Sequence, residues 1–507
     1  MSSPIRPRFG WVTTQAMNAI PKMKRALICF AVFFAITAGA ALAADPTDTT
    51  FGSDGIAEIE ARVEPREDVG QVGGIADLQP TRGGKMLVAV YPIAVGGHYF
   101  AAARIDPNGA LDRSFGKNGF TPYIDASRRK GGDAAGALQA EAVAGLKGGK
   151  VLLAGYYEDG GIFAPALALF TAKGRLDPGF GHDGKVFPRP TFDGTPISAD
   201  GGGERLRDVA VEPDGTIVGV GDVVGGINTG PTQPGAVVVA YRPDGKVDRA
   251  FGHDGHLRIL VRHHGRYSGY TGFTEVRALP SGKLLVSGYI HQRYVLYRLT
   301  ADGKIDRSFG RDGRVAFAKP GAHAIKITSF FEAPFTVDRK GRIVVSVPTF
   351  PEGGEEPIVF ERLLPDGRRD TSFGKSNYME PAPIDSRESG RRHGAAVQSF
   401  SFSPLAIAID GRGRILVTGG ETAPYTRGQQ EPGHEDFTTR RFLANGHRDG
   451  SFGQGGVWHT DPPGSQSLAR AALTQPDGRI VAGGWIQIER DGGNGPGNTA
   501  MLLTRYK

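Results

Sequence analysis

One short motif recurs along the chain at nearly even intervals. It reads Asp-x-x-Phe-Gly-x-x-Gly, as in residues 306–313, and it occurs seven times in 507 residues, once with Asn377 in place of the last glycine. Successive motif phenylalanines are 58 to 79 residues apart, and they are Phe51, Phe115, Phe180, Phe251, Phe309, Phe373 and Phe452. A repeat of this length indicates one supersecondary unit per copy, with neighbouring units stacked into a ring or a solenoid.

The clearest unit predicts four short antiparallel strands. Alternating apolar residues and β-branched runs predict these strands at 206–211, 216–224, 236–241 and 256–261. Tight turns ending in Gly215 and Gly245 join the first strand to the second and the third to the fourth. Glycine suits the positive φ that such hairpin turns need. Four antiparallel strands joined in this way form one blade of a β-propeller.

The two ends of the repeat region complement each other. The last unit stops after a third strand at 501–505, whereas residues 47–62 hold a motif copy and a fourth strand with no strands before it. We therefore predict an all-β fold, a seven-bladed propeller of four-stranded antiparallel blades in which the N-terminal strand completes the last blade. Closing the ring in this way removes a free strand edge.

The Asp-x-Ser-Phe-Gly-x-Asp-Gly segment, with the Pro-Asp-Gly-type turn and apolar strand of each unit, resembles a known family. It is similar to the delta-60 repeat family of bacterial β-propellers and, more distantly, to NHL propellers. The resemblance covers about residues 45–507. It implies a propeller fold, but it implies no activity and no catalytic residues.

Residues 1–43 are typical of a secretory signal peptide, and residues 44–507 are expected to form the single propeller domain. Lys24 and Arg25 begin a basic segment, an apolar run follows at 26–38, and small residues at 41 and 43 form a cleavage site. Met17 and Met23 offer alternative starts, which would make residues 1–22 a mis-called extension. The competing interpretation, a membrane anchor, needs about 18 or more apolar residues. We therefore expect a secreted or periplasmic protein with no membrane span after cleavage.

Removal of the leader changes the charge of the chain. The leader contains five of the 60 basic side chains and none of the 53 acidic ones, so the net charge falls from +7 to +2. This balance does not indicate a nucleic-acid partner. The single cysteine, Cys29, lies in the leader, so the mature chain has no disulfide, cysteine metal ligand or cysteine nucleophile. Such a chain suits an oxidising compartment.

Two interpretations exist for the aspartate that begins each motif copy. Together with Asp54, Asp183, Asp254 and Asp312, these aspartates could form a ring of calcium sites. The alternative is an Asx turn, in which the carboxylate accepts backbone N–H groups while the phenylalanine packs between blades. Calcium loops need acidic residues at alternate positions around one ion, which this spacing does not supply. The sequence therefore favours the structural interpretation.

Strand order assigns the connections to the two ends of the blades. The tight glycine turns lie at one end, and every long connection lies at the other, which we call the long-loop end. The long connections are 188–204, 222–235, 261–274, 349–357, 378–399, 421–436 and 488–498. Since loops on a rigid scaffold commonly carry binding residues, the long-loop end is the predicted binding face.

Two of these connections contain candidate ligand-binding residues. One groups imidazole, guanidinium and phenol side chains, and the other holds an arginine pair; the residues are His263, His264, Arg266, Tyr267, Tyr270, Arg391 and Arg392. Aromatic faces beside polar donors suit a polysaccharide, a peptide or an envelope protein. The alternative is that these aromatic side chains pack onto the rim of a blade.

The central channel is the second candidate site. Alignment of the first strands on their turn glycines, seven residues back, brings Asp77, Asp208 and Glu275 to one level. These acids could hold a divalent cation or polarise water, although acidic residues at strand ends are commonly just solvated. No other cofactor is expected.

Standard catalytic motifs do not occur in the sequence. It has no phosphate-binding Gly-x-x-x-x-Gly-Lys-Ser/Thr loop, no His-Glu-x-x-His and no Gly-x-Ser-x-Gly elbow. We therefore expect a monomeric binding or scaffold propeller rather than an enzyme. The alternative is a propeller hydrolase, lactonase or lyase that uses a metal in the channel.

Overall fold

The computed structural model describes the greater part of the repeat region. The described residues are 45–60, 72–92, 100–124, 137–159, 162–187, 191–192, 195–196, 202–224, 235–260, 271–291, 293–317, 334–347, 359–374, 401–422, 435–460, 466–488 and 498–507. They belong to one unit of the chain, Asp45–Lys507, and the predicted leader lies outside them. No helix among these residues is long and apolar enough to cross a membrane.

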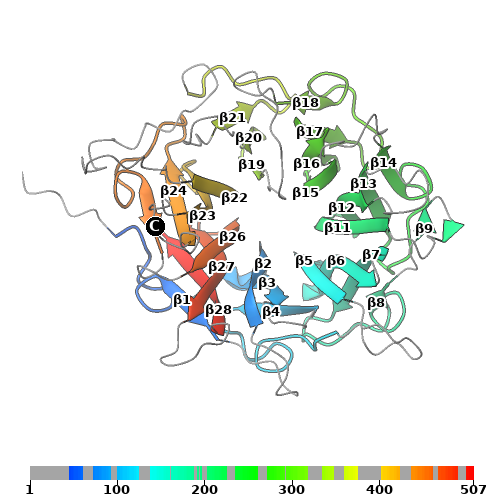
Figure 1. The fold of residues 1–507 in the computed structure, drawn as a ribbon, viewed down its shortest axis with the longest axis horizontal. Coiled ribbons are helices and arrows are strands. Elements are labelled where there is room, and N and C mark those ends of the chain that lie inside the picture. The colour runs from blue at the N-terminus through cyan, green and yellow to red at the C-terminus, as the bar shows by residue number, and fades with distance from the viewer. Residues whose placement is uncertain are drawn as a thin grey trace, which may run out of the picture. The chain divides into compact units, whose positions relative to one another are not determined.

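The described chain is a succession of antiparallel sheets (Figure 1). The first contains β2 (Val72–Pro80), β3 (Met86–Pro92) and β4 (Ala101–Ile105). The second contains β5 (Ala137–Gly145), β6 (Val151–Asp159), β7 (Ile162–Phe170) and β8 (Lys185–Val186). The third contains β11 (Gly202–Val211), β12 (Ile217–Val224), β13 (Gly235–Tyr241) and β14 (His256–Leu260). A two-residue parallel contact between β7 and β11 joins the second sheet to the third, and β9 (Thr191–Phe192) and β10 (Thr195–Pro196) form a separate hairpin.

The remaining sheets repeat the same order. One contains β15 (Gly272–Ala278), β16 (Leu284–Ile290), β17 (Arg293–Leu299) and β18 (Arg314–Ala316). The next contains β19 (Phe335–Val337), β20 (Ile343–Val347) and β21 (Val359–Leu363), and it is followed by β22 (Ser401–Ile409), β23 (Ile415–Thr422), β24 (Glu435–Phe442) and β25 (Val457–His459). The last contains β26 (Ser467–Thr474), β27 (Ile480–Ile488), β28 (Asn498–Tyr506) and β1 (Ile56–Ile59).

The middle strands of each sheet are buried on both faces, and the core lies between neighbouring sheets. All seven side-chain positions of β13 are buried, which explains its continuous apolar sequence. Val220 of β12 packs in one cluster with Phe273 of β15 and Val286 of β16, from the following sheet. Sheet-on-sheet packing of this kind makes each unit depend on its neighbours.

The first strand of each sheet is its inner strand, and consecutive inner strands contact one another. These contacts run from β2 to β5, β11 and β15, and from β19 to β22 and β26. The last inner strand, β26, also contacts β2. Figure 1 shows β5, β11 and β15 on the inner side of their sheets.

The N-terminal strand joins the C-terminal sheet. β1 pairs with β28 in antiparallel register from Ile56 opposite Thr504 to Ile59 opposite Met501. Phe51, which precedes β1, is fully buried in a cluster that also contains Leu503 and, from β2, Ile75. β1 therefore adds a fourth strand to the sheet of β26, β27 and β28.

Every motif copy forms an Asx turn. The aspartate accepts the backbone N–H two residues later at 3.0 to 3.2 Å in all seven copies, and the motif phenylalanines are 0 to 2% exposed. The second acidic residue has its own backbone role, because Asp54, Asp183, Asp254 and Asp312 all have φ between 50° and 54°. Aspartate and asparagine tolerate this left-handed conformation better than most residues. Both sets of aspartates therefore have structural roles in the corner.

An arginine from the third strand ties each of five motif copies to the next unit. Arg362 Nε donates to Asp370 Oδ2 at 2.8 Å, its guanidinium lies 4.4 Å from the ring centre of Phe373, and Nη1 donates to the carbonyl oxygen of Ala444 in the following unit at 2.7 Å. We call this arrangement the arginine clasp. Equivalent clasps are made by Arg104, Arg298, Arg441 and Arg505.

The clasp keeps its carboxylates ionised although they are buried. Burial acts to raise the pKa of Asp370, but hydrogen bonds from Ser372 and Arg362 outweigh it and hold the pKa below its usual value. For Asp48, burial is likewise outweighed by hydrogen bonds from Thr50 and Arg479, and the pKa falls to about 2. A buried charge pair with several hydrogen bonds loses much more when one partner is removed than an exposed pair does.

We therefore expect that replacement of one clasp arginine lowers the stability of the fold by a large amount. Arg362→Met should lower the free energy of unfolding by about 3 kcal/mol, because Asp370 would stay buried without its hydrogen-bonded cation, and the remaining cation, Arg342, lies 3.9 Å away. Urea denaturation of the purified protein measures the change. Arg368→Met is the matched control, since Arg368 is 76% exposed in its ion pair with Asp366 and should change stability by less than about 0.5 kcal/mol. Equal losses in the two variants would contradict a special role for the clasp.

The pairing of β1 with β28 gives a second prediction. A chain of residues 61–507 should have a lower melting temperature than a chain of residues 45–507 and should aggregate, because it lacks the buried ring of Phe51 and exposes the edge of β28. Differential scanning calorimetry and light scattering measure both effects. Glu58→Ala, a change at an exposed position of β1, serves as the control. An unaltered melting curve after the deletion would show that β1 is dispensable.

Candidate functional site

A β-bulge occurs at the same place in six inner strands. The pairing of each inner strand with its neighbour skips one residue, and the skipped residues are Ala76, Glu141, Arg207, Thr274, Leu405 and Arg470. A bulge leaves its extra residue outside the ladder and redirects the side chain. All six extra residues line one cavity of about 80 Å³. The local irregularity of the inner strands therefore builds a common site, which we call the channel cavity.

The channel cavity is strongly charged. Its lining includes the predicted acids Asp77, Asp208 and Glu275, which the structure brings together from three inner strands. It also includes one further acid and three arginines, namely Glu141, Arg207, Arg277 and Arg470. The cavity therefore offers both signs of charge within a small volume.

The three predicted acids bind the backbone of the next inner strand. Asp77 Oδ2 accepts the N–H of Val143 at 2.9 Å, and Asp208 Oδ2 accepts that of Val276 at 2.8 Å. Glu275 Oε2 accepts the N–H of Phe335 at 3.0 Å. Each of these carboxylates thus spans two units, in the same way as the arginine clasps do nearer the outer strands.

Arg277 lies among these acids. Its guanidinium forms an ion pair with Glu275, and its Nη1 lies 3.5 Å from Asp208 Oδ2. Burial raises the pKa of Asp208 to about 8, with a smaller contribution from Asp77 and Glu275, and the charge of Arg277 opposes this rise. Burial also raises the pKa of Asp77. Raised pKa values of two buried carboxyl groups are therefore a feature of this cavity.

The geometry adds no support for a cation site. Within the described ranges, no group of three or more His, Cys, Asp or Glu side chains is arranged to hold a metal ion. The carboxylate oxygens of Asp77, Asp208 and Glu275 instead contact backbone N–H groups and Arg277. The metal site stays a prediction from the sequence.

A chain of charged side chains extends from the cavity between the second and third sheets. Glu141 Oε1 lies 3.2 Å from Arg207 Nη1, and Arg207 Nε lies 3.1 Å from Asp222 Oδ1. Arg205 Nε in turn lies 3.0 Å from Asp222 Oδ2, and the guanidinium lies over Phe163. Asp222 is two residues from the end of β12, so this chain, which we call the arginine relay, reaches towards the long-loop end.

Tyr156 and Gln139 attach the relay to the second sheet. Tyr156 Oη donates to Gln139 Oε1 at 2.6 Å, and Gln139 Nε2 donates to Glu141 Oε1 at 2.9 Å. Arg205 and Arg207 both lie within 6 Å of the Tyr156 ring centre. Burial, and to a smaller extent the charge of Glu141, raise the pKa of Tyr156 to about 12, so it remains a neutral donor.

The predicted loop residues cannot be placed at this site. His263, His264, Arg266, Tyr267 and Tyr270 fall within 261–270, which lies outside the described residues. Arg391 and Arg392 fall within 375–400, which also lies outside them. These residues stay predictions from the sequence.

Sequence reasoning missed the relay. Arg207 and Glu141 each stand next to an aligned channel position, and only the bulge turns both neighbours towards the cavity. The available signal was a single charged residue inside an inner strand, as Glu141 is within 137–145. Arg277 was missed because it lies two residues beyond Glu275 and outside the aligned level.

The comparisons with known proteins agree with the class of fold. The profile of a family described as "Domain of unknown function (DUF5122) beta-propeller" matches residues 84–115, 149–180 and 279–309. Each matched segment runs from the turn after an inner strand to a motif phenylalanine, so the match falls at the same place in three of the repeat units. The all-β architecture and this match define the protein as a β-propeller. The delta-60 name stays a prediction, because the match covers only three segments.

Solved structures resemble the chain only distantly. The polysaccharide lyase Uly1 shares 10% identity, with 88% of this chain and 93% of that chain covered and a TM-score of 0.39. A protein from Lactobacillus plantarum shares 10% identity, with 82% and 98% covered and a TM-score of 0.42. The α-L-arabinanase from Penicillium chrysogenum shares 10% identity, with 89% and 97% covered and a TM-score of 0.36. No curated protein matches the sequence, and structural likeness at this level carries no functional argument.

The channel charges predict a titration that can be observed directly. The carboxyl group of Asp208 should titrate near pH 8, and Arg277→Met should raise that pKa further, because the variant removes the charge that opposes protonation. Carbon NMR of aspartate labelled at the carboxyl carbon, with Asp208→Asn for assignment, measures both values. Arg242→Met, at an exposed turn, should leave the titration unchanged. A pKa near 4 for Asp208 would contradict the assignment.

Proposed function

We propose that the chain is an exported, seven-bladed β-propeller that binds a polysaccharide, a peptide or a protein at its channel cavity and long-loop end. Seven blades are supported by the seven motif copies and by the repeated inner strands. Closure of the ring by the N-terminal strand is supported by the pairing of β1 with β28 and by the contact of β26 with β2. Export rests on the leader-like sequence of residues 1–43.

The arginine relay is the observation that carries the binding proposal. Asp222 is 3% exposed in its side chain, and Arg205 and Arg207 are 14% and 18% exposed. Buried ion pairs of this kind add little to stability, because desolvation offsets their mutual attraction, and apolar replacements are often neutral or stabilising. Polar groups held in fixed positions beside a cavity are, in contrast, what a recognition site needs.

The distribution of short and long connections also supports a binding site at the long-loop end of the blades. Tight, hydrogen-bonded turns join the first strand to the second and the third to the fourth. At one of them, the N–H of Gly215 donates to the backbone carbonyl oxygen of Glu212 at 2.9 Å. The long connections all join the opposite ends of the strands. A ligand that enters from the long-loop end would meet the loop residues first and the relay next.

A second candidate function is hydrolysis or elimination in the channel. Asp208, with its pKa of about 8, would be a proton donor at neutral pH, and perturbed carboxyl groups in cavities are common at active sites. Two backbone N–H groups, those of Val209 and Val276, already occupy the carboxyl oxygens of Asp208. This engagement favours a positioning role for the residue and makes binding the better supported function.

Replacement of Arg207, the relay arginine that lines the channel cavity, tests the binding proposal. A glycan array and an envelope-protein pull-down with the mature protein should identify a ligand, and Arg207→Met should weaken its capture about tenfold or more, since a charge-assisted contact is lost. Arg242→Met, at a turn on the opposite end of the strands, is the matched control. Tyr267→Ala with Tyr270→Ala and Arg392→Ala test the predicted loop contribution. Unchanged capture by the folded Arg207 variant would overturn the proposed site.

Turnover assays separate the two functions. If the protein only binds its ligand, it should release no product from lactone, glycoside or uronate polymer substrates. Elemental analysis of the mature protein should then find no stoichiometric metal. Turnover that is abolished by both Asp208→Asn and Glu275→Gln, with folding retained, would instead support the enzyme.

A further inference from the structure

The arginine clasp is missing from the sheet of β11–β14. The position held by the clasp arginine in five other units is Ala240 in this unit. The cation that follows the first turn, such as Lys85 paired with Asp112 or Lys283 paired with Asp306, is replaced by Thr216. Among the described residues, the motif aspartate Asp248 has no ion-pair partner and keeps only its Asx turn to the N–H of Ala250. Both cationic contacts have been lost together.

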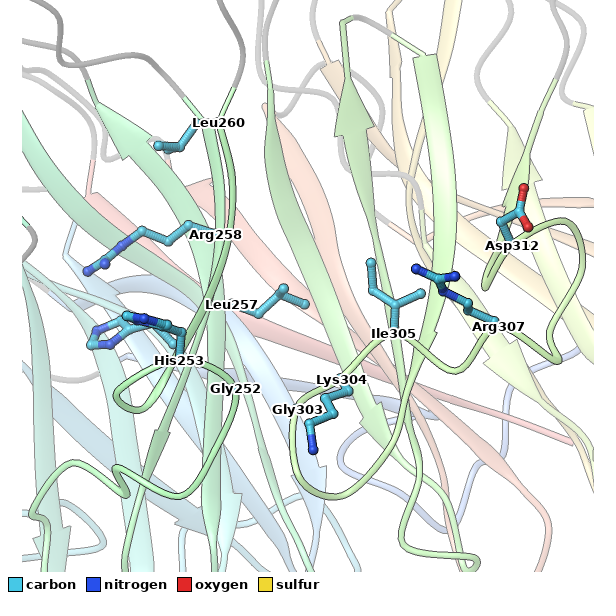
Figure 2. A pocket seen from close by; sticks show the side chains of 11 residues that line it. Gly252, His253, Leu257, Arg258, Leu260, Gly303, Lys304, Ile305, Arg307 and Asp312 are labelled. Atoms are coloured by element: carbon cyan, nitrogen blue, oxygen red, sulfur yellow. The ribbon is translucent and has the colours of Figure 1, made fainter.

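A cleft lies at the same junction (Figure 2). It has a volume of about 850 Å³ and lies between the corner and outer strand of this unit and the turn and corner of the next. Leu257 of β14 points across it towards Ile305 of the following unit, and Arg307 also extends towards Ile305. The loss of the clasp therefore coincides with an opening between the two units.

The lining of this cleft is basic. It includes Arg258, Lys304 and Arg307, the imidazoles of His253 and His256, and one acid, Asp312. In Figure 2, Arg258 and His253 point away from Ile305, whereas Arg307 extends towards it. Arg258 is held by Glu204 at 2.7 Å, and Lys304 forms an exposed ion pair with Asp302 at 2.6 Å. Arg307 forms no ion pair with any described residue, so its guanidinium is available for a bidentate contact with a carboxylate.

The apolar part of the cleft is aliphatic. It is formed by Leu257, Ile305 and Leu260, and Leu260 is one of the few large apolar side chains that are exposed, at 39%. No aromatic residue belongs to the described lining. Sugar rings are usually bound on aromatic faces, whereas an aliphatic slot suits the branched side chain of a peptide. The lining thus favours a peptide over a polysaccharide.

We propose that this cleft docks an acidic peptide segment of a protein partner. An aliphatic side chain of the segment enters between Leu257 and Ile305, and a neighbouring carboxylate pairs with Arg307. Lys304 adds a second positive charge when its weak surface pair with Asp302 opens. The cleft involves outer strands and corners, so this site is separate from the channel cavity and does not rest on the function proposed there.

A labelled model peptide tests the proposal. The probe is fluorescein-Glu-Leu-Glu-Leu-Glu-amide, and its anisotropy is followed as the mature protein is added at low salt. The parent protein should bind this probe and should not bind the same peptide with lysine in place of glutamate. Arg307→Glu should weaken binding about tenfold or more.

Controls separate docking from general charge attraction. Arg311→Glu makes the same charge change at an exposed position of the same corner, outside the cleft lining, and should leave binding unchanged. Equal weakening by Arg307→Glu and Arg311→Glu, or binding of oligogalacturonate but not of the peptide, would overturn the proposal. Leu260→Ser, at an exposed position, should weaken binding of the peptide severalfold. Full affinity in that variant would exclude the apolar contact. Arg207→Met should leave peptide binding intact, which distinguishes this site from the channel.

Discussion

The ion pair between a third-strand arginine and a motif aspartate gives the association of the sheets its direction in five of the repeat units. Apolar packing between sheets is strong but not directional, so it does not by itself fix how one unit sits against the next. The clasp adds direction, because one guanidinium contacts the aspartate and phenylalanine of its own corner and a carbonyl oxygen of the next turn, as Arg298 does with Asp306, Phe309 and Pro365. A backbone hydrogen bond from Gly310 to Asp366 lies beside it.

Between the inner strands, negatively charged carboxylates join one unit to the next. There a carboxylate reaches across and accepts an N–H group of the following strand, as Asp208 does with Val276. Units are thus joined by arginines near the outer strands and by carboxylates at the bulges of the inner strands. The relay, with Arg207 and Asp222 at its centre, belongs to neither device. Two relay residues, Glu141 and Arg207, line the channel cavity, where polar groups in fixed positions can act in recognition.

The fold was largely predictable because its determinants are local. The predicted strands at 216–224, 236–241 and 256–261 differ from β12, β13 and β14 by one residue at an end, since β-branched runs and turn glycines act within a few positions. The channel level of Asp77, Asp208 and Glu275 was also predictable, because the turn glycine fixes the strand register. The relay was not, because a bulge changes which neighbour faces the cavity. The clasp was not predictable either, because its carbonyl acceptor lies in another unit, 66 to 82 residues away in chain order in four clasps and 398 residues away in that of Arg505.

The repeat also shows that the two roles of the motif can be separated. At Asp248 the Asx turn is intact although both cations are absent, so the aspartate is required by the corner itself and the arginine by the neighbouring unit. The junction that follows retains the hydrogen bond from Gly252 to Asp302 and the packing of Phe251 near Gly303. These contacts join the two units where the clasp is absent. A unit of this kind can therefore lose its clasp without losing its corner, and at this junction the side chains of the cleft are available for a partner.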